Sequence, residues 1–497
     1  MKKNSVNPAI QHVFVLMLEN RSFDHMLGFL NNNISNYSNT YKGINYPATQ
    51  PADYIMPYDP GHEFLDVLEQ LCGAGVDYPN GGTYPAINNS GFVSNYATTK
   101  STGEGGATSN FGEIMKCYTP AIELPVMTAL VNNFALCDQW FSSLPGPTWP
   151  NRFFVHAASS AGLDHGPTLT ELTEWETVHG FSFPRGSIYQ LLDKYKKKYR
   201  LYRGVTHPLA GCIPGVAALK GIQIWDTHNY ENFERDVNDN YPYSYTFIEP
   251  NYGDFINNTY SGGQSQHPMD DVRGGEALIK STYEALRNSP IWESSLLIIT
   301  YDEHGGFYDH VAPPAAKAPG DTKPNSKYNQ YGFTFKQYGV RVPALIVSAY
   351  TPNTVDHTLY DHSSVAATLE AMFKMPALTK RDANANNITS LASLPAARNT
   401  PLTLPPVAAV TMEEEAALRE RQHPVNEEIA TADSGNLPGF LHIVLKGRLE
   451  REPTKSLAAQ TAIVVDFSAI KTRADARQYI EDNLPGLLAA EYELAPA

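Results

Sequence analysis

Carboxylate, amide and histidine side chains gather where short apolar segments end. The first such group is Glu19-Asn-Arg-Ser-Phe-Asp-His25, which follows the apolar run Val13 to Leu18. A carboxylate and an amide oxygen at a strand end are hard ligands that suit a divalent cation. The alternative is that Asn20 and Ser22 cap the following helix while Glu19 is solvated. This segment alone is compatible with both interpretations.

A second group places two adjacent carboxylates and two histidines after the apolar run Leu296 to Tyr301. It reads Asp302-Glu-His-Gly-Gly-Phe-Tyr-Asp-His310. Adjacent carboxylates at the end of a buried strand repel one another and lose solvation unless a cation compensates them. The two glycines allow a ligand to approach the backbone closely. A charged turn punctuated by glycine is the weaker alternative, because ordinary strand ends do not collect this set of side chains.

A third segment carries a hydroxyl in a stiff turn, Leu144-Pro-Gly-Pro-Thr-Trp-Pro-Asn-Arg152. Thr148 precedes Phe153 to Ala157, which is predicted to open a helix, and the N–H groups of a helix N-terminus stabilise negative charge. An alcohol still needs a base or a metal to become a nucleophile. Taken in isolation, Thr148 is more typical of a helix N-cap.

Further histidines lie in loops. His62 ends the segment Asp-Pro-Gly-His, and His267 lies in Gln-His-Pro-Met-Asp-Asp. A lone loop histidine is usually structural, and His207 and His442 are interpreted in that way. Capping of the following helix explains His362 adequately.

The elements that must position these groups alternate along the chain. Apolar runs typical of strands buried on both faces lie at Val13 to Leu18, Leu296 to Tyr301 and Ala344 to Ser348. Helical periodicity occurs at 125–133, 274–288 and 364–373. This alternation predicts an α/β fold with a mostly parallel sheet between helical layers. Ligands gather at the carboxyl ends of such strands.

Two regions break this alternation. Residues 31–111 are rich in Asn, Gly, Tyr and Thr and are predicted to form long loops over one end of the sheet. Residues 395–408 have the composition of a Pro-rich linker. The expected organisation is a catalytic domain at 1–394 and a small, largely helical C-terminal unit at 409–497. We expect that unit to shape substrate access or stability and to contribute no catalytic group.

The composition of the chain excludes several classes of binding partner. A net charge of -15 and a pI near 5.5 exclude non-specific nucleic-acid binding and broad attraction to an anionic membrane, leaving at most a transient membrane-surface contact. The four cysteines share no CxxC spacing and are predicted to be buried thiols. No run approaches the roughly 20 apolar residues of a membrane span, and no signal-peptide pattern is present. The expected location is cytoplasmic, with a trimmed signal or another export route as alternatives. The sequence indicates no oligomeric state.

The segments ENRSFDHMLG, DPGH, SLPGPTWPNR, a His-Pro pair and YDEHGGFYDHV occur here in one order. In that order they resemble the phosphoesterase family of bacterial and plant non-specific phospholipases C and a related bacterial acid phosphatase. The resemblance spans about residues 10–375. It implies an alkaline-phosphatase-like fold, which agrees with the α/β prediction.

The resemblance also implies roles for individual residues. One divalent cation (Ca, Mg, Mn, Zn or Fe, which the sequence does not distinguish) would be held by Glu19, Asn20, Thr148, Asp302 and Glu303. The hydroxyl of Thr148 corresponds to the one that is phosphorylated during turnover. Histidines around the phosphoryl group correspond to His62, His267 and His304. Substrate contacts are weaker expectations for His310, Asn151 and Arg152, since the last two are better suited to fixing the turn.

The function implied is metal-dependent phosphoester hydrolysis through a phosphothreonine intermediate. A phospholipase C that releases diacylglycerol and a phosphorylated head group is the leading interpretation, with a phospholipid or small phosphoester as substrate. A broad-specificity acid phosphatase is the alternative. A non-catalytic metal- or phosphate-binding protein on the same fold is the rival of another class. A sulfatase is disfavoured, because neither Cys nor Ser occupies the position of Thr148.

Overall fold

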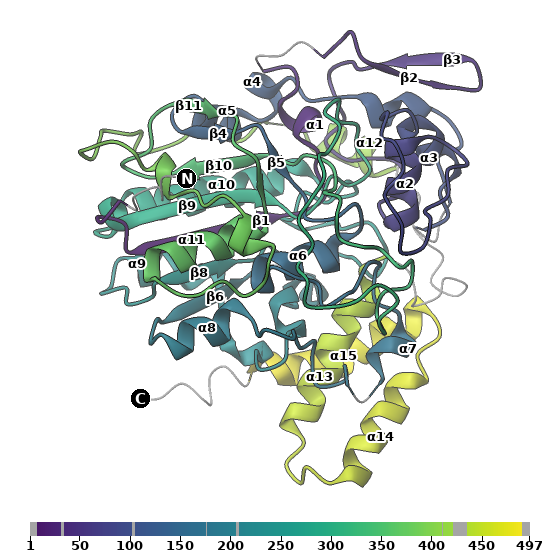
Figure 1. Cartoon of the computed structure of the whole chain (residues 1–497), viewed down its shortest axis with the longest axis vertical. Coiled ribbons are helices and arrows are strands. Elements are labelled where there is room, and N and C mark those ends of the chain that lie inside the picture. The colour runs from purple at the N-terminus through teal and green to yellow at the C-terminus, as the bar shows by residue number, and fades with distance from the viewer. Residues whose placement is uncertain are drawn as a thin grey trace.

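A computed structural model describes residues 7–30, 34–101, 105–174, 176–204, 208–409, 411–420 and 435–489. Its centre is an eight-stranded sheet (Figure 1). In sheet order the strands are β11 (Thr354–Asp356), β4 (Ala135–Cys137), β10 (Ala344–Val347), β9 (Ser295–Tyr301), β1 (His12–Leu18), β8 (Tyr245–Ile248), β6 (Tyr199–Arg203) and β7 (Thr227–Asn229). Both pairings of β10 are antiparallel, and the remaining pairings are parallel. The predicted mostly parallel sheet is therefore confirmed.

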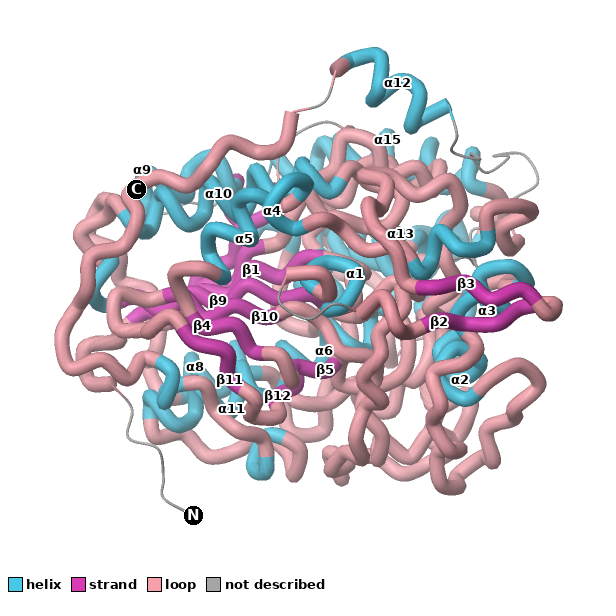
Figure 2. Tube along the Cα trace, turned by 90° about the horizontal axis from the view of Figure 1, so that it is seen from above, coloured by secondary structure: helices cyan, strands magenta, loops and turns pink. Residues whose placement is uncertain are grey.

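Helices cover both faces of this sheet (Figure 2). One layer contains α4 (Pro120–Glu123), α5 (Pro125–Val131), α9 (Phe233–Val237) and α10 (Val272–Arg287), and the other α6 (Thr148–Ala157), α8 (Ile188–Lys194) and α11 (Ser363–Phe373). The predicted helices at 125–133, 274–288 and 364–373 correspond to α5, α10 and α11. The α/β class with helical layers is confirmed.

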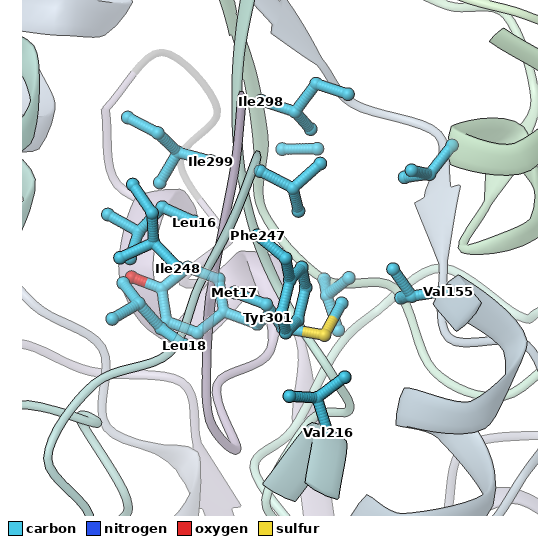
Figure 3. Packing of buried hydrophobic residues seen from close by; sticks show 14 of the residues in the cluster. Leu16, Met17, Leu18, Val155, Val216, Phe247, Ile248, Ile298, Ile299 and Tyr301 are labelled. Carbon is cyan, nitrogen blue, oxygen red and sulfur yellow. The ribbon is translucent and has the colours of Figure 1, made fainter. Parts of the chain in front are cut away.

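The core is built where the central strands meet these layers. Leu16, Met17, Phe247 and Ile298 are buried side chains of β1, β8 and β9 (Figure 3). Val155 of α6 belongs to the same cluster. Burial on both faces explains why these strands are continuous apolar runs rather than alternating ones.

The region 31–111 is not made of loops alone, contrary to the prediction. It contains the hairpin of β2 (Ser38–Tyr41) and β3 (Ile44–Pro47), then α2 (Phe64–Cys72) and α3 (Phe92–Thr98). Helix α2 buries Phe64, Val67, Leu68 and Leu71. Their spacing is that of one helix face. The helical pattern was therefore present in the sequence, but the polar, glycine-rich residues around it obscured the pattern.

Short elements complete the chain. These are α1 (Phe23–Leu27), β5 (Trp140–Phe141), α7 (Leu169–Leu172), β12 (Tyr360–Asp361) and the 3₁₀ helices η1 (Phe111–Met115), η2 (Leu209–Cys212), η3 (Gly215–Ala218), η4 (Ile224–Asp226), η5 (Tyr230–Asn232), η6 (Trp292–Ser294), η7 (Asp382–Asn384) and η8 (Thr389–Leu391). All four cysteines are buried and unpaired, as predicted. Among the described residues, no helix has the length and hydropathy needed to cross a bilayer.

The segment expected to be a linker lies along α10. Leu404 N donates to Glu284, Tyr283 donates to the Pro401 carbonyl and Arg287 to that of Thr400. Beyond it come α12 (Met412–Glu420), α13 (Leu437–Arg451), α14 (Leu457–Ser468) and α15 (Arg473–Ala489). The C-terminal region is thus helical as predicted, with α13 and α15 packed on the rest of the chain.

Candidate active site

The site begins where two parallel strands end together. β1 and β9 pair in a register that sets Leu18 opposite Tyr301, so Glu19 and Asp302 leave the sheet from neighbouring positions. The backbone N–H of Asn20 donates to Asp302 Oδ1 at 3.0 Å. Asn20 has a φ of 59°, and asparagine tolerates this left-handed conformation better than most residues.

A glycine pair lets the two strand-end loops touch. Gly305 has a φ of 63°, and a Cβ built there would lie 2.1 Å from the Asn20 carbonyl oxygen. Any larger residue would separate the loops. The glycines of the Asp302 to His310 segment are therefore required by loop contact, in addition to any approach of a ligand.

We call the place where β1 and β9 end the junction. The carboxylate oxygens there are buried, and some of them accept no hydrogen bond. Both oxygens of Glu19 and Oε1 of Glu303 have no hydrogen-bond partner among the described residues. Burial, and then the charge of Asp302, raises the pKa of Glu19 to about 8. Burial also raises the pKa of Asp302 to about 6, although Arg152 opposes this. Buried carboxylates that lack donors are costly unless a cation compensates them, so this donor set fits the predicted metal.

Arg152 contributes part of the compensating charge. Its Nε lies 2.9 Å from Asp302 Oδ2, and its Nη2 lies 3.9 Å from Glu19 Oε1. Arg152 sits on α6, one turn after Thr148. The side chain thereby ties the helix that carries the hydroxyl to both strand ends. This geometry agrees with a positioning role better than with a substrate contact.

The structure places Thr148 at the first residue of α6, with Pro147 at the N-cap and no side-chain cap bond. The N-cap interpretation of Thr148 is therefore wrong. The helix also begins earlier than Phe153, because prolines are tolerated in a first helical turn. The Thr148 hydroxyl instead donates to Asn20 Oδ1 at 3.4 Å, which brings it to the carboxylate junction.

Asn151 holds the turn before this helix. Its side-chain amide donates to the carbonyls of Gly146 at 2.9 Å and Pro147 at 3.1 Å, while its oxygen accepts from Leu144 N at 3.1 Å. These bonds occupy the amide, so its part in the site is to fix the backbone around Thr148.

Two of the three predicted phosphoryl histidines contact this junction directly. His62 Nε2 lies 3.4 Å from the Asn20 amide, and His62 Nδ1 lies 2.8 Å from the Pro60 carbonyl. Burial lowers the pKa of His62, but Glu303 and Asp59 outweigh it and raise the value to about 9. His304 Nδ1 lies 3.2 Å from Glu303 Oε2, and burial lowers the pKa of His304.

The third, His267, is adjacent to His62, with ring centroids 6.0 Å apart. Its Nε2 lies 3.9 Å from Asp59 Oδ1, and neither atom has a hydrogen-bond partner among the described residues. Tyr260 stacks on the imidazole at 3.4 Å with an interplanar angle of 6°. Burial, and then the neighbouring His62, lowers the pKa of His267 well below its usual value. Asp59 and Tyr260 are site neighbours that sequence reasoning missed, although Asp59 belongs to the Asp-Pro-Gly-His segment.

His362 has a different role from the predicted cap. It occupies the N-cap position of α11 but its side chain makes no cap bond. Its Nδ1 accepts from the Trp140 indole at 3.2 Å, which places the proton on Nε2, 2.6 Å from the Asp302 carbonyl oxygen. His362 thus supports the backbone at the end of β9.

His310 does not join the other predicted site residues in the contacts that the structure describes. Its Nδ1 lies 2.6 Å from Asp24 Oδ2. Arg341 pairs with Asp24 at 2.9 Å and with Asp309 at 3.2 Å. We call these four residues the Arg341 cluster. His442 contacts the Thr177 carbonyl within the C-terminal packing, and His207 lies outside the described residues.

The C-terminal helices contact the same turn that carries Thr148. Phe440 of α13 packs on Trp149 with ring centroids 5.3 Å apart, and a Cβ at Gly439 would lie 2.1 Å from the indole. Asn436 donates to the Tyr260 hydroxyl at 3.4 Å. The Pro-rich segment therefore separates α13 from the motifs along the chain but not in space.

Comparisons with known proteins find relatives over most of the chain. The Phosphoesterase family model matches residues 10–376. Non-specific phospholipase C6 of Arabidopsis thaliana is 34% identical, with 93% of this chain and 92% of that protein aligned. Phospholipase C B of Mycobacterium tuberculosis is 27% identical, with 77% of each chain aligned.

A solved phosphonate monoester hydrolase of Agrobacterium radiobacter covers 78% of both chains at 9% identity and a TM-score of 0.35, a likeness too weak to support an inference. The match to the family model spans the strand ends, the Thr148 turn and all the predicted site residues. The chain therefore belongs to the Phosphoesterase family, whose members hydrolyse phosphoric esters.

Proposed function

We propose that this phosphoester hydrolase is a phospholipase C that releases diacylglycerol and a phosphorylated head group through a phosphothreonine at Thr148. The observation that carries the proposal is the Thr148 hydroxyl, which is free of a capping role and donates toward Asn20 beside unsatisfied buried carboxylates. The names of the relatives, non-specific phospholipase C and phospholipase C B, support the lipid substrate.

Glu19, Asn20, Asp302 and Glu303, together with Thr148, would hold one divalent cation. When bound, such a cation favours the threonine alkoxide and offsets charge on the transferring phosphoryl group. The unsatisfied oxygens of Glu19 and Glu303 support this assignment, because they offer the hard ligands that such ions prefer. Arg152 pairs with Asp302 and lies close to Glu19, which supports the position of both carboxylates at the strand ends.

The first chemical step uses the hydroxyl oxygen of Thr148. It attacks phosphorus in line with the departing alcohol, so one P–O bond forms to Thr148 as the bond to diacylglycerol breaks. His62, whose pKa is raised to about 9, carries a positive charge at neutral pH that stabilises the phosphoryl oxygens. The proton of the Thr148 hydroxyl passes to a neutral neighbouring histidine, His267 or His304, and that histidine gives it to the departing alcohol.

The second step regenerates the enzyme. Water attacks the phosphothreonine, and one of its protons passes to the same histidine, which is neutral again. That histidine gives the proton to the Thr148 oxygen as the P–O bond breaks. The phosphorylated head group leaves. His267 and His304 are suited to receive this proton, because burial lowers the pKa of each and keeps it neutral beforehand.

A product panel tests the proposal. Purified protein is incubated with phosphatidylcholine, its lysolipid and an aryl phosphate, with and without a chelator, and diacylglycerol, phosphocholine and free phosphate are measured. The expected result is chelator-sensitive formation of diacylglycerol and phosphocholine. Hydrolysis of the aryl phosphate alone would favour the acid phosphatase, and inactivity on every ester after addition of divalent cations would favour the non-catalytic alternative.

A further inference from the structure

The two ring nitrogens of His304 have different partners. Nδ1 lies 3.2 Å from Glu303 Oε2 at the junction, whereas Nε2 lies 2.7 Å from Oε1 of Gln70, a residue of α2. Gln70 is completely buried and lies outside every segment that carries the family resemblance. A histidine beside the proposed cation site is thus held by a side chain that has no assigned role.

The orientation of the Gln70 amide follows from a second neighbour. The Gly61 carbonyl lies 2.6 Å from Gln70 Nε2, and a carbonyl can only accept a hydrogen bond. The atom beside it is therefore the amide nitrogen, and Oε1 is the atom that faces His304. Because this oxygen also can only accept, His304 must donate to it from Nε2. The neutral imidazole then carries its proton on Nε2, which leaves Nδ1 as the accepting nitrogen on the side of the junction.

A chain of hydrogen bonds orients Gln70 in turn. Gln70 Nε2 also donates to Asn95 Oδ1 at 2.8 Å, and Asn95 Nδ2 donates to Asp66 Oδ1 at 2.8 Å. The carboxylate at the end accepts two further hydrogen bonds, from the hydroxyls of Thr99 and Ser101. Since a carboxylate can only accept, the donors of the chain all point from His304 toward Asp66. Hydrogen bonds aligned in this way polarise and strengthen one another.

Two helices hold this chain in place. Asp66 and Gln70 lie one turn apart on α2, and Asn95 lies on α3, which packs alongside it (Figure 1). All three residues are buried. A Cβ at Gly61 would lie 2.6 Å from the Asp66 carboxyl carbon, so the glycine of the Asp-Pro-Gly-His segment allows the segment to pack on α2. Disturbing a buried amide leaves its partners unsatisfied, which is costly, and the chain therefore keeps one arrangement.

We propose that Gln70 is a positioning residue of the reaction, which holds the His304 ring in one orientation with its proton on Nε2. The inference rests on the proposed function, because it takes His304 as one of the histidines that serve the phosphoryl group. Among the described residues, Gln70 makes no side-chain hydrogen bond to Thr148 or to a carboxylate of the junction. It acts through His304, and Asn95 and Asp66 act through Gln70.

A double-mutant cycle tests this role. Gln70→Met removes the amide at nearly constant volume. On whichever water-soluble aryl ester the wild type hydrolyses, aryl phosphocholine or aryl phosphate, kcat and kcat/KM should fall together by about ten- to a hundredfold. In a His304→Ala background the same substitution should change kcat by less than about twofold, because the residue that Gln70 positions is absent.

Gln337→Met is the matched control. Gln337 is another buried glutamine, and its amide donates to the carbonyls of Pro313, Pro314 and Tyr338. Its loss removes hydrogen bonds of the same kind at a place that contacts no residue of the active site in the described hydrogen bonds. The control should lower the unfolding temperature and leave kcat within about twofold of wild type.

NMR of wild-type protein with isotope-labelled histidine measures the tautomer directly, and it does not require any Gln70 variant to fold. The His304 signals, identified by their loss in His304→Ala, should show the proton on Nε2. A proton on Nδ1 alone overturns the inference. In folded Gln70→Met the proton should no longer be confined to Nε2.

The kinetic outcomes are equally decisive. A wild-type kcat in Gln70→Met overturns the inference. An equal loss in the His304→Ala background also overturns it, because Gln70 would then act on the site without His304. Failure of the wild type on every ester overturns the proposed function, whereas the tautomer of His304 in the wild type and in Gln70→Met still decides whether Gln70 orients this histidine.

Discussion

Two clusters of carboxylates lie a few residues apart on the same two loops, and they differ in how far their oxygens are hydrogen-bonded. In the Arg341 cluster every oxygen of Asp24 and Asp309 accepts a hydrogen bond, from Arg341, from His310 or from backbone N–H groups. At the junction of Glu19 and Glu303, three oxygens accept none. Ligand atoms of Asp24, Asp309 and His310 do lie within 4.8 Å of one another, yet Arg341 already pairs with both carboxylates and His310 with Asp24. Closeness of ligand atoms and unsatisfied oxygens are therefore separate criteria, and the two clusters differ in the second.

The largest effect expected within the junction follows removal of its hydroxyl. Thr148→Ala should lower kcat by about a thousandfold or more, because the attacking oxygen is gone. Thr148→Ser should recover much of the rate, since it restores the oxygen in the same turn. Steady-state kinetics measure both, and mass spectrometry of acid-quenched enzyme should find phosphate on Thr148. A Thr148→Ala enzyme with near wild-type rate would remove this residue from the chemistry.

Glu19→Gln changes the carboxylate of the junction whose two oxygens both accept no hydrogen bond in the part of the chain that the structure describes. We expect loss of the bound cation and a decrease in kcat on the order of a hundredfold or more. The fold should persist, because glutamine has the same shape and the Glu19 oxygens accept no hydrogen bond from the described residues. Metal content by elemental analysis and unfolding temperature are the measurements. Full metal occupancy in the folded variant would show that the cation is held elsewhere.

The two histidines that accompany the two groups should behave differently. His304→Ala should lower kcat by about a hundredfold, the usual range for a general acid or base. His310→Ala should change kcat by only a few-fold, because this imidazole is committed to Asp24. Equal losses in the two variants would bring the Arg341 cluster into the active site.

Asp24→Asn tests the Arg341 cluster through stability. The substitution leaves Arg341 buried without one of its two carboxylates, and breaking such a pair costs about 3 kcal/mol or more. Denaturant unfolding should show this loss, while kcat of the folded protein stays within a few-fold of wild type. A stable but inactive Asp24→Asn protein would contradict the assignment of a structural role.

The smallest expected effect is the pH dependence of stabilisation by a cation. In cation-free protein the pKa is about 8 for Glu19 and about 6 for Asp302, each above the value of 4.5 or 3.8 of the unfolded chain. The folded state thus retains protons that the unfolded state loses, and the free energy of unfolding falls as pH rises from about 4 to about 8. A divalent cation should therefore raise the unfolding temperature more at pH 8 than at pH 5. Calorimetry of chelator-treated protein, with and without added cation, measures the difference.

Much of the junction could be predicted from sequence, because local patterns specify it. An apolar run followed by a carboxylate marks the end of a buried strand, and parallel strands bring such ends together. Glu19 and Asp302 met in this way. The start of α6 was predicted too late in the sequence, because Pro147 and Pro150 are typical of a turn. Both prolines also fit the N-cap and first turn of a helix.

Other features depend on packing between distant segments and leave no local pattern. Arg341 pairs with Asp24 although more than three hundred residues separate them in the sequence. The residues next to Asp24 give no sign of this pairing. His362 precedes a helix as a capping residue would, but its ring is oriented by hydrogen bonds to Trp140 and to the Asp302 carbonyl. The contact of Phe440 with Trp149 joins two segments whose separate patterns indicate only helices.

That last contact has a consequence for the order in which the enzyme is completed during synthesis. The turn that holds Thr148 leaves the ribosome long before α13, so Trp149 lacks its contact with Phe440 until α13 has been made. Domains fold as they emerge, and the central sheet can form while this cover is still absent. The packing around the Thr148 turn is then completed later than the central sheet. A nascent chain would carry its motifs in place before α13 supplies the contact with Trp149.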